Sequence, residues 1–199
     1  SAGGMTIGSS LLMLATPPAK SSETLSIHFS AVGWGLALGA LWVLLFKNSQ
    51  NWSELWISSG LLIVIMGAPA LRFNGWSIHP LKQQAIDQAK DIPIAKALLI
   101  LVATAYFCEG VGYVISATFL VSILQHQNTI PHLGDYAWLV VGLAMVPSCW
   151  LWVKLAQRIG DFPALIGAYV LQSIGIILPV VSQSEILAIV GAVLFGGTV

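Results

Sequence analysis

The sequence has very little charge. It contains 8 lysines and arginines and 8 aspartates and glutamates in 199 residues, so only 8% of the chain is charged, while 57% is hydrophobic. A typical soluble domain is about 25% charged. A chain with so little charge cannot cover a surface that faces water. The composition therefore predicts an integral membrane protein, embedded in the lipid bilayer, and we expect no nucleic-acid partner.

Cysteine and metal-ligand patterns are also scarce. Cys108 and Cys149 both lie inside apolar segments and no CxxC spacing occurs, so they are expected to be small buried hydrophobic residues. His126 and His132 have no third ligand nearby in the sequence. We predict no metal site and no cofactor. The chain lacks a GxxxxGK[ST] loop, which disfavours an ATP-driven pump.

The two ends of the chain fall within apolar segments. The opening SAGGMTIGSSLLMLA has neither an initiator methionine nor the basic region of a signal peptide, and the chain ends in the apolar run GAVLFGGTV. We therefore expect this chain to be an internal fragment of a longer membrane protein.

The apolar segments predict an all-α fold, a polytopic transmembrane helix bundle. Roughly 20 apolar residues are enough for a helix to cross the hydrocarbon core of a bilayer. Polar turns and prolines separate seven such segments, of which the first and last are incomplete: residues 3–15, 25–46, 54–71, 95–124, 136–155, 163–181 and the segment that begins at 185.

The basic residues give the predicted spans an orientation. Counted by alternate connections, one side of the membrane receives seven of the eight basic residues: Lys20, Arg72, Lys82, Lys90, Lys96, Lys154 and Arg158. The other side receives Lys47 alone. Because lysine and arginine accumulate in cytoplasmic loops, the side with seven is predicted to be cytoplasmic.

Small residues recur every four positions in the second span. Ala31, Gly35 and Gly39 form a small-xxx-small ridge that would let another helix approach closely. We predict that this ridge packs against the span at residues 136–155.

Glu109 is the acid that most needs an explanation, because it lies in the middle of the span at 95–124. Placing a charged side chain at the centre of a bilayer is costly, so such a group normally faces a cavity or a partner. On a helix, Tyr106, Glu109, Tyr113 and Ser116 share one face. These four residues are our candidates for substrate binding and proton coupling. A low-dielectric environment favours the neutral carboxyl, which suits a group that takes up and releases a proton. The alternative is a structural role, in which a protonated Glu109 bonds to a neighbouring helix.

Three sequence features resemble the major facilitator superfamily. The turn WVKLAQRIGD is similar to the superfamily's loop motif G-x-L-A-D-R-x-G-R, with matches at Leu155, Ala156, Arg158 and Gly160 and departures at Val153, Gln157 and Asp161. A Gly-Gly-x-Thr sequence starting at Gly3 is echoed by Gly-Gly-Thr at Gly196, as expected if the two halves of the protein are parallel repeats. The segment YFCEGVGYVISATFL resembles the seventh span of the YbfB/YjiJ-like branch.

The resemblance implies that the chain covers approximately spans 4 to 10. Residues 1–71 would then be the end of the N-terminal six-helix half, 72–95 the cytoplasmic connector, and 96–199 the start of the C-terminal half. Arg158 and Gly160 would belong to the cytoplasmic loop motif. The implied location is the bacterial inner (plasma) membrane.

The function implied by the resemblance is secondary active transport, not an enzyme reaction. The partners would be a small-molecule substrate and protons, moved by alternating access as two bundles rock around a midplane site. The alternatives are a membrane-embedded enzyme and a non-transporting membrane scaffold. An enzyme would need a constellation such as HExxH, a GxSG serine with a histidine, or paired intramembrane acids, and the sequence contains none of them. A scaffold would not need Glu109.

Overall fold

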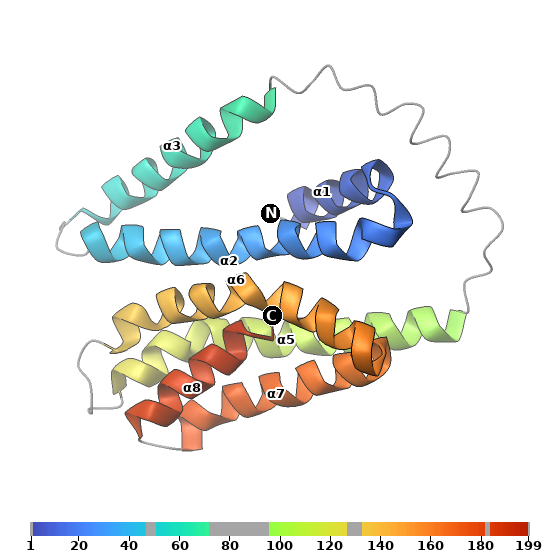
Figure 1. Ribbon diagram of the computed structural model, residues 1–199. Coiled ribbons are helices and arrows are strands. Elements are labelled where there is room, and N and C mark those ends of the chain that lie inside the picture. The colour runs from blue at the N-terminus through green and yellow to red at the C-terminus, as the bar shows by residue number, and fades with distance from the viewer. Residues whose placement is uncertain (1, 47–50, 72–95, 127–132, 182–183, 199) are drawn as a thin grey trace. The chain divides into compact units, whose positions relative to one another are not determined.

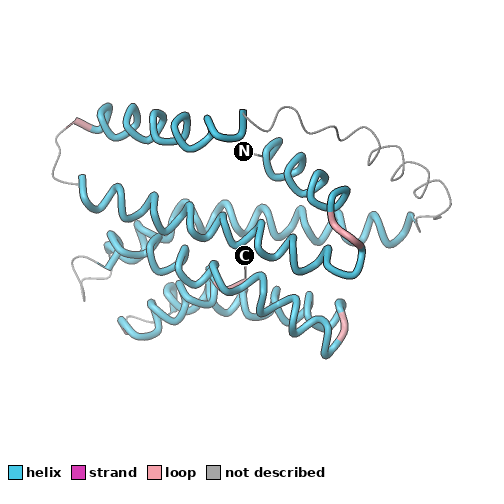
Figure 2. The backbone as a smooth tube through the Cα atoms, turned by 45° about the horizontal axis from the view of Figure 1, so that its top comes forward, coloured by secondary structure: helices cyan, strands magenta, loops and turns pink. Residues whose placement is uncertain are grey.

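A computed structural model describes residues 2–46, 51–71, 96–126, 133–181 and 184–198. These segments are almost entirely helical and contain no strand (Figure 2). The chain runs through α1 (Ala2–Ala15), a 3-10 turn η1 (Pro18–Lys20), α2 (Ser21–Phe46), α3 (Trp52–Leu71), α5 (Lys96–His126), α6 (Leu133–Ile159), α7 (Asp161–Val181) and α8 (Glu185–Gly196) (Figure 1).

The predicted all-α architecture is confirmed. Among the described residues, five helices are long and apolar enough to cross a membrane, and α1 and α8 supply two shorter apolar helices. The predicted spans match the helices to within a few residues, because apolar runs separated by prolines and polar turns leave few other ways to satisfy the backbone in a bilayer. The predicted connector at 72–95, with the boundary it would draw between two halves, lies outside the described residues.

The chain divides into two compact units, which are described separately. Unit 1 comprises Ser1–Leu41 and Pro93–Val199, and unit 2 comprises Trp42–Ile92. In unit 2 the end of α2 is tied to α3 by a hydrogen bond of 3.2 Å from Trp42 Nε1 to Ser58 Oγ. The ring of Trp42 also packs against Phe46, with 4.8 Å between the ring centroids.

The core of unit 1 lies among α5, α6 and α8. Leu124 of α5, Val141 of α6 and Phe195 of α8 are buried in one cluster, which is completed by Leu120, Ala137, Ala188 and Ala192. Figure 1 shows α5 to α8 packed side by side. Small residues allow this close packing: a methyl group added at Gly175 on α7 would lie 2.8 Å from the backbone nitrogen of Phe195 on α8.

The contact between α2 and α6 uses a different ridge from the predicted one. Gly33 and Ala37 of α2 meet α6, and a methyl group at Gly33 would lie only 2.8 Å from the backbone nitrogen of Val146. Around Gly35 and Gly39, by contrast, no described atom lies within 4 Å of such a methyl group. The partner helix was predicted correctly and the face of α2 was wrong.

The two faces are offset by two residues, and two residues turn a helix by about 200°. The predicted and observed ridges therefore point in nearly opposite directions.

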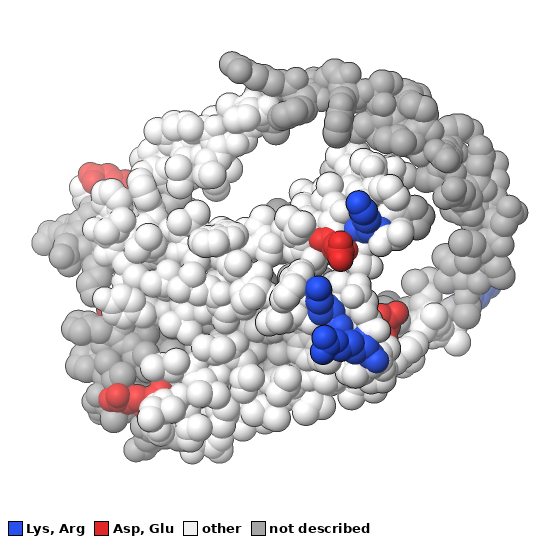
Figure 3. Space-filling view, viewed as in Figure 1, with Lys and Arg blue, Asp and Glu red and all other residues white. Residues whose placement is uncertain are grey.

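The described basic side chains gather toward one end of the helices of unit 1. Lys20 lies in the turn before α2, Lys96 begins α5, and Lys154 and Arg158 lie near the end of α6. In Figure 3 the lysines and arginines lie toward one end, where acidic side chains lie beside them, and the charged side chains visible at the opposite end are acidic. The one-sided placement of basic residues is expected of a membrane protein with a basic cytoplasmic side.

Gly160 explains part of the loop motif. It is the single residue between α6 and α7, and its φ of 95° is in the left-handed region, which side chains other than glycine rarely adopt. Its N–H donates to the carbonyl of Ala156 at 2.8 Å and its own carbonyl accepts from Ala164 at 3.2 Å. A glycine is therefore needed to end one helix and start the next without an intervening loop.

Gly160→Ala should destabilise the protein, because an alanine held at this φ costs about 1–2 kcal/mol. Gly60→Ala is the matched control. It makes the same change inside α3, where no described atom lies within 4 Å of the new methyl group, and alanine favours helix over glycine by about 1 kcal/mol. Thermal unfolding of the purified variants should give a lower Tm for Gly160→Ala only. Equal Tm values would show that the turn adapts to a side chain.

Candidate functional site

A cavity of about 300 Å³ lies between α5 and α7, both in unit 1. Helix α5 contributes Ala105, Cys108, Glu109, Gly112 and Tyr113, and α7 contributes Tyr169, Gln172, Ser173 and Ile176. Its size is at the lower end of the range of about 300–1,000 Å³ that is usual for ligand pockets.

Glu109 is half-buried at the wall of this cavity, near the middle of α5. Helix α5 begins at Lys96, and 109 − 96 = 13 residues correspond to about 20 Å along the helix axis. The carboxyl group therefore lies deep within the thickness that an apolar helix of this length would cross. Tyr113, on the same helix, and Tyr169, on α7, both lie within electrostatic range of it.

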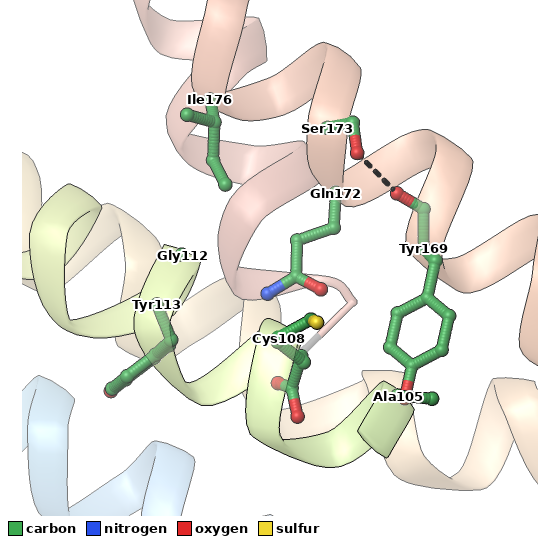
Figure 4. A pocket seen from close by; sticks show the side chains of 9 residues that line it. Ala105, Cys108, Gly112, Tyr113, Tyr169, Gln172, Ser173 and Ile176 are labelled. Carbon is green, nitrogen blue, oxygen red and sulfur yellow. Dashed lines mark hydrogen bonds between the residues drawn. The ribbon is translucent and has the colours of Figure 1, made fainter. Parts of the chain in front are cut away.

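Gln172 is the most deeply buried polar residue of the cavity, with 5% of its surface exposed. Figure 4 shows its carboxamide directed from α7 toward Cys108 on α5. No hydrogen bond joins it to another residue in the part of the chain that the structure describes. An amide has two donor hydrogens and an acceptor oxygen, so Gln172 presents unused hydrogen-bonding capacity to the cavity.

The hydroxyl-bearing side chains around the cavity differ in their contacts. Ser173 Oγ donates to the carbonyl of Tyr169 at 2.8 Å (Figure 4), so its proton is already used within α7. The phenol of Tyr169 extends toward Ala105 on α5. The ring of Tyr113 is held against Phe195 of α8, in a stacked arrangement with 5.6 Å between centroids.

The structure brings together two of the four residues predicted on one face of α5. Glu109 and Tyr113 line the cavity. Tyr106 is 70% exposed and outside the lining, although it lies within electrostatic range of Tyr169. Ser116 lines a separate, mainly apolar cavity of about 140 Å³, and its hydroxyl donates to the carbonyl of Gly112 at 2.7 Å. The roles of these four residues remain predictions.

The α7 side of the cavity was missed by sequence reasoning. Tyr169, Gln172 and Ser173 lie at spacings of three and four residues in an otherwise apolar span, which places them on one helical face. That stripe of polar residues in the sequence could have identified them as cavity residues. The remaining predicted residues, Arg158 and Gly160, lie at the turn after α6 and not in the cavity lining.

The described residues offer no metal centre. No three histidine, cysteine, aspartate or glutamate side chains come together in this part of the chain. The cavity instead combines one carboxyl, one free amide and two phenols with apolar walls, a set of groups suited to binding a small molecule by charge and hydrogen bonding.

Comparison with known proteins decides the family. A family model described as the uncharacterised MFS-type transporter YbfB matches residues 1–199, which is the whole chain. The chain belongs to this family. It is thus a multi-pass integral membrane protein of the major facilitator superfamily, and membership of a transporter family implies a small-molecule substrate. No curated protein and no solved structure matches this transporter.

Proposed function

We propose that the protein is a proton-coupled secondary active transporter that moves a small solute by alternating access, with Glu109 as the coupling group. Residues 1–71 would be the end of one six-helix half and 96–199 the start of the other, with 72–95 connecting them on the cytoplasmic side. The inner membrane of a bacterium is the proposed location.

The observation that carries this proposal is the position of Glu109. It is an acid far from both ends of α5, and it lines a cavity that the Gln172 carboxamide also lines. A carboxyl at that depth is stable when it is protonated or paired with a cation. Binding and release of a proton would therefore change the charge of the cavity at the place where a solute would bind.

The residues of the cavity give less support to the two alternative functions, a membrane-embedded enzyme and a non-transporting scaffold. The described residues around the cavity contain no nucleophile with a histidine beside it, and the carboxyl stands without a second acid. A scaffold would not need an acid and an amide that face a cavity, since placing polar groups within an apolar helix costs free energy.

The proposal is tested with the full-length transporter in liposomes, using a panel of radiolabelled small solutes and an imposed pH gradient. At least one solute should accumulate against its own gradient, because moving a proton through one pH unit releases about 1.36 kcal/mol, enough for about tenfold accumulation. A protonophore should abolish that accumulation. Solute movement that is unaffected by both the pH gradient and the protonophore would contradict proton coupling.

A further inference from the structure

The cavity between α5 and α7 contains one acid and no basic side chain. Its nine lining residues include Glu109 but neither lysine, arginine nor histidine. The described basic residues lie near helix ends, with Lys96 starting α5 and Lys154 and Arg158 closing α6. Nothing among the described side chains therefore neutralises a charged Glu109.

An uncompensated charge in a mostly apolar cavity is expensive, so the carboxylate needs a positive partner. A proton is one such partner and a cationic ligand is the other. An anionic ligand would face the same carboxylate with no cation to bind it, which makes anions the disfavoured class.

The polar groups of the cavity fit a ligand that carries N–H groups or a compact positive charge. The Gln172 carboxamide is buried and directed toward α5, and its oxygen can accept from an ammonium group. The electron-rich face of a tyrosine attracts a cation within about 6 Å of its centre. Tyr169 places one such ring at the cavity, whereas the ring of Tyr113 stacks on Phe195 and points away from Gln172 (Figure 4).

We propose that this cavity binds a small organic cation, of the amine or quaternary ammonium class, with Glu109 as its counterion. The cation and the proton then compete for one carboxylate, so that each displaces the other. This inference rests on the proposed function and adds to it the chemical class of the solute. The volume of about 300 Å³ is sufficient for a small cation.

The titratable groups near Glu109 are one thiol and three phenols. Tyr106, Cys108 and Tyr113 are its neighbours on α5, and Tyr169 faces it from α7. The helices α6 and α8 carry their described charged side chains near their ends: Asp135, Lys154 and Arg158 on α6, and Glu185 on α8.

Cys108 was expected to be buried, but it lines the cavity as a free, exposed thiol and therefore provides a direct test. In full-length transporter whose other cysteines, including Cys149, are replaced by serine, Cys108 is modified with two methanethiosulfonate reagents, one bearing trimethylammonium and one bearing sulfonate. Each rate is divided by the rate with a free thiol in solution. The cationic reagent should be faster by about tenfold or more, because of the nearby carboxylate.

Glu109→Gln should bring the ratio of the two normalised rates close to one, while Glu185→Gln, the same change at the start of α8, should leave it as in the unsubstituted background. A ratio at or below one before substitution, or a ratio that Glu109→Gln leaves unchanged, would overturn the proposal. So would a Cys108 that neither reagent can reach, since the cavity would then be closed to small cations.

The second test measures competition at Glu109 itself. Dicyclohexylcarbodiimide reacts with protonated carboxyls in apolar surroundings, and labelling of Glu109 is followed by mass spectrometry. Tetramethylammonium should slow the labelling, whereas tert-butanol and pivalate, which share its branched shape without the positive charge, should not. Equal effects of all three compounds would overturn the choice of a cation.

The cation class and proton coupling through Glu109 can be disproved separately. If labelling of Glu109 depends on pH but tetramethylammonium gives no protection, the cation class is wrong and proton coupling stands. If pH-driven accumulation does not depend on Glu109, the proposed function itself is wrong.

Discussion

Glu109→Gln is expected to abolish gradient-driven accumulation of the solute, reducing its final inside-to-outside ratio to about one. Exchange of unlabelled for labelled solute should weaken as well, because Glu109 is also the proposed counterion of the solute. Glutamine keeps the shape and hydrogen-bonding capacity of the carboxyl but cannot release a proton. With wild-type protein, one pH unit can sustain about tenfold accumulation. The pH dependence of transport should also flatten in the variant, because the titrating group has been removed.

The control is Glu185→Gln, which makes the same change in the first turn of α8. It should accumulate solute as the wild type does when uptake is normalised to folded protein. Unchanged, still pH-dependent accumulation by Glu109→Gln would show that the carboxyl is structural. In that case Glu109→Ala, which cannot satisfy a hydrogen-bonding partner, should destabilise the protein where glutamine does not.

Gly33→Ala is expected to reduce the stability of the folded protein by about 1–3 kcal/mol, the usual cost of inserting a methyl group into a packed contact. The new methyl would lie 2.8 Å from the nitrogen of Val146, 2.9 Å from the carbonyl oxygen of Gly142 and 3.0 Å from the carbonyl carbon of Met145. All three are backbone atoms of α6, so a rotamer change cannot relieve the clash. Either α2 or α6 must move.

Gly35→Ala is a closely matched control because it lies two residues away on the same helix. No described atom lies within 4 Å of its added methyl group. It should be neutral or slightly stabilising, since alanine has the higher helix propensity. The measurement is the Tm and the yield of monodisperse protein in detergent. Equal losses for both variants would mean that α2 does not meet α6 through Gly33, while loss for Gly35→Ala alone would restore the ridge predicted from the sequence.

The sequence was sufficient to predict the helices, for a physical reason. A bilayer requires each spanning segment to satisfy its own backbone hydrogen bonds, so an apolar run of sufficient length has to be a helix. The polar sequence before Trp52 and the proline pair before Lys20 then indicated where the helices end.

The faces of those helices were harder to predict. In α2 two sets of small residues alternate, one containing Gly35 and the other containing Gly33 and Ala37. Both have the spacing that permits close packing, and periodicity alone cannot say which set meets a partner. The choice depends on α6, where Gly142 provides the complementary space: a methyl group there would lie 2.5 Å from the backbone nitrogen of Ala37.

Periodicity within one helix was also insufficient to predict both walls of the cavity. Periodicity placed Tyr113 on the face of Glu109, and both line the cavity. It could not identify the opposite wall, because a pattern within one helix does not name the helix that it faces. Gln172 and Tyr169 became candidates only when the structure placed α7 beside α5.

The turn at Gly160 has a mechanical consequence. One residue reaches at most about 3.6 Å, so the last turn of α6 and the first turn of α7 cannot separate. The α7 side of the cavity begins at Tyr169, 169 − 160 = 9 residues beyond this joint. Nine helical residues extend about 13 Å, so a change in the angle between α6 and α7 at Gly160 would move Tyr169 and Gln172 along an arc about that residue.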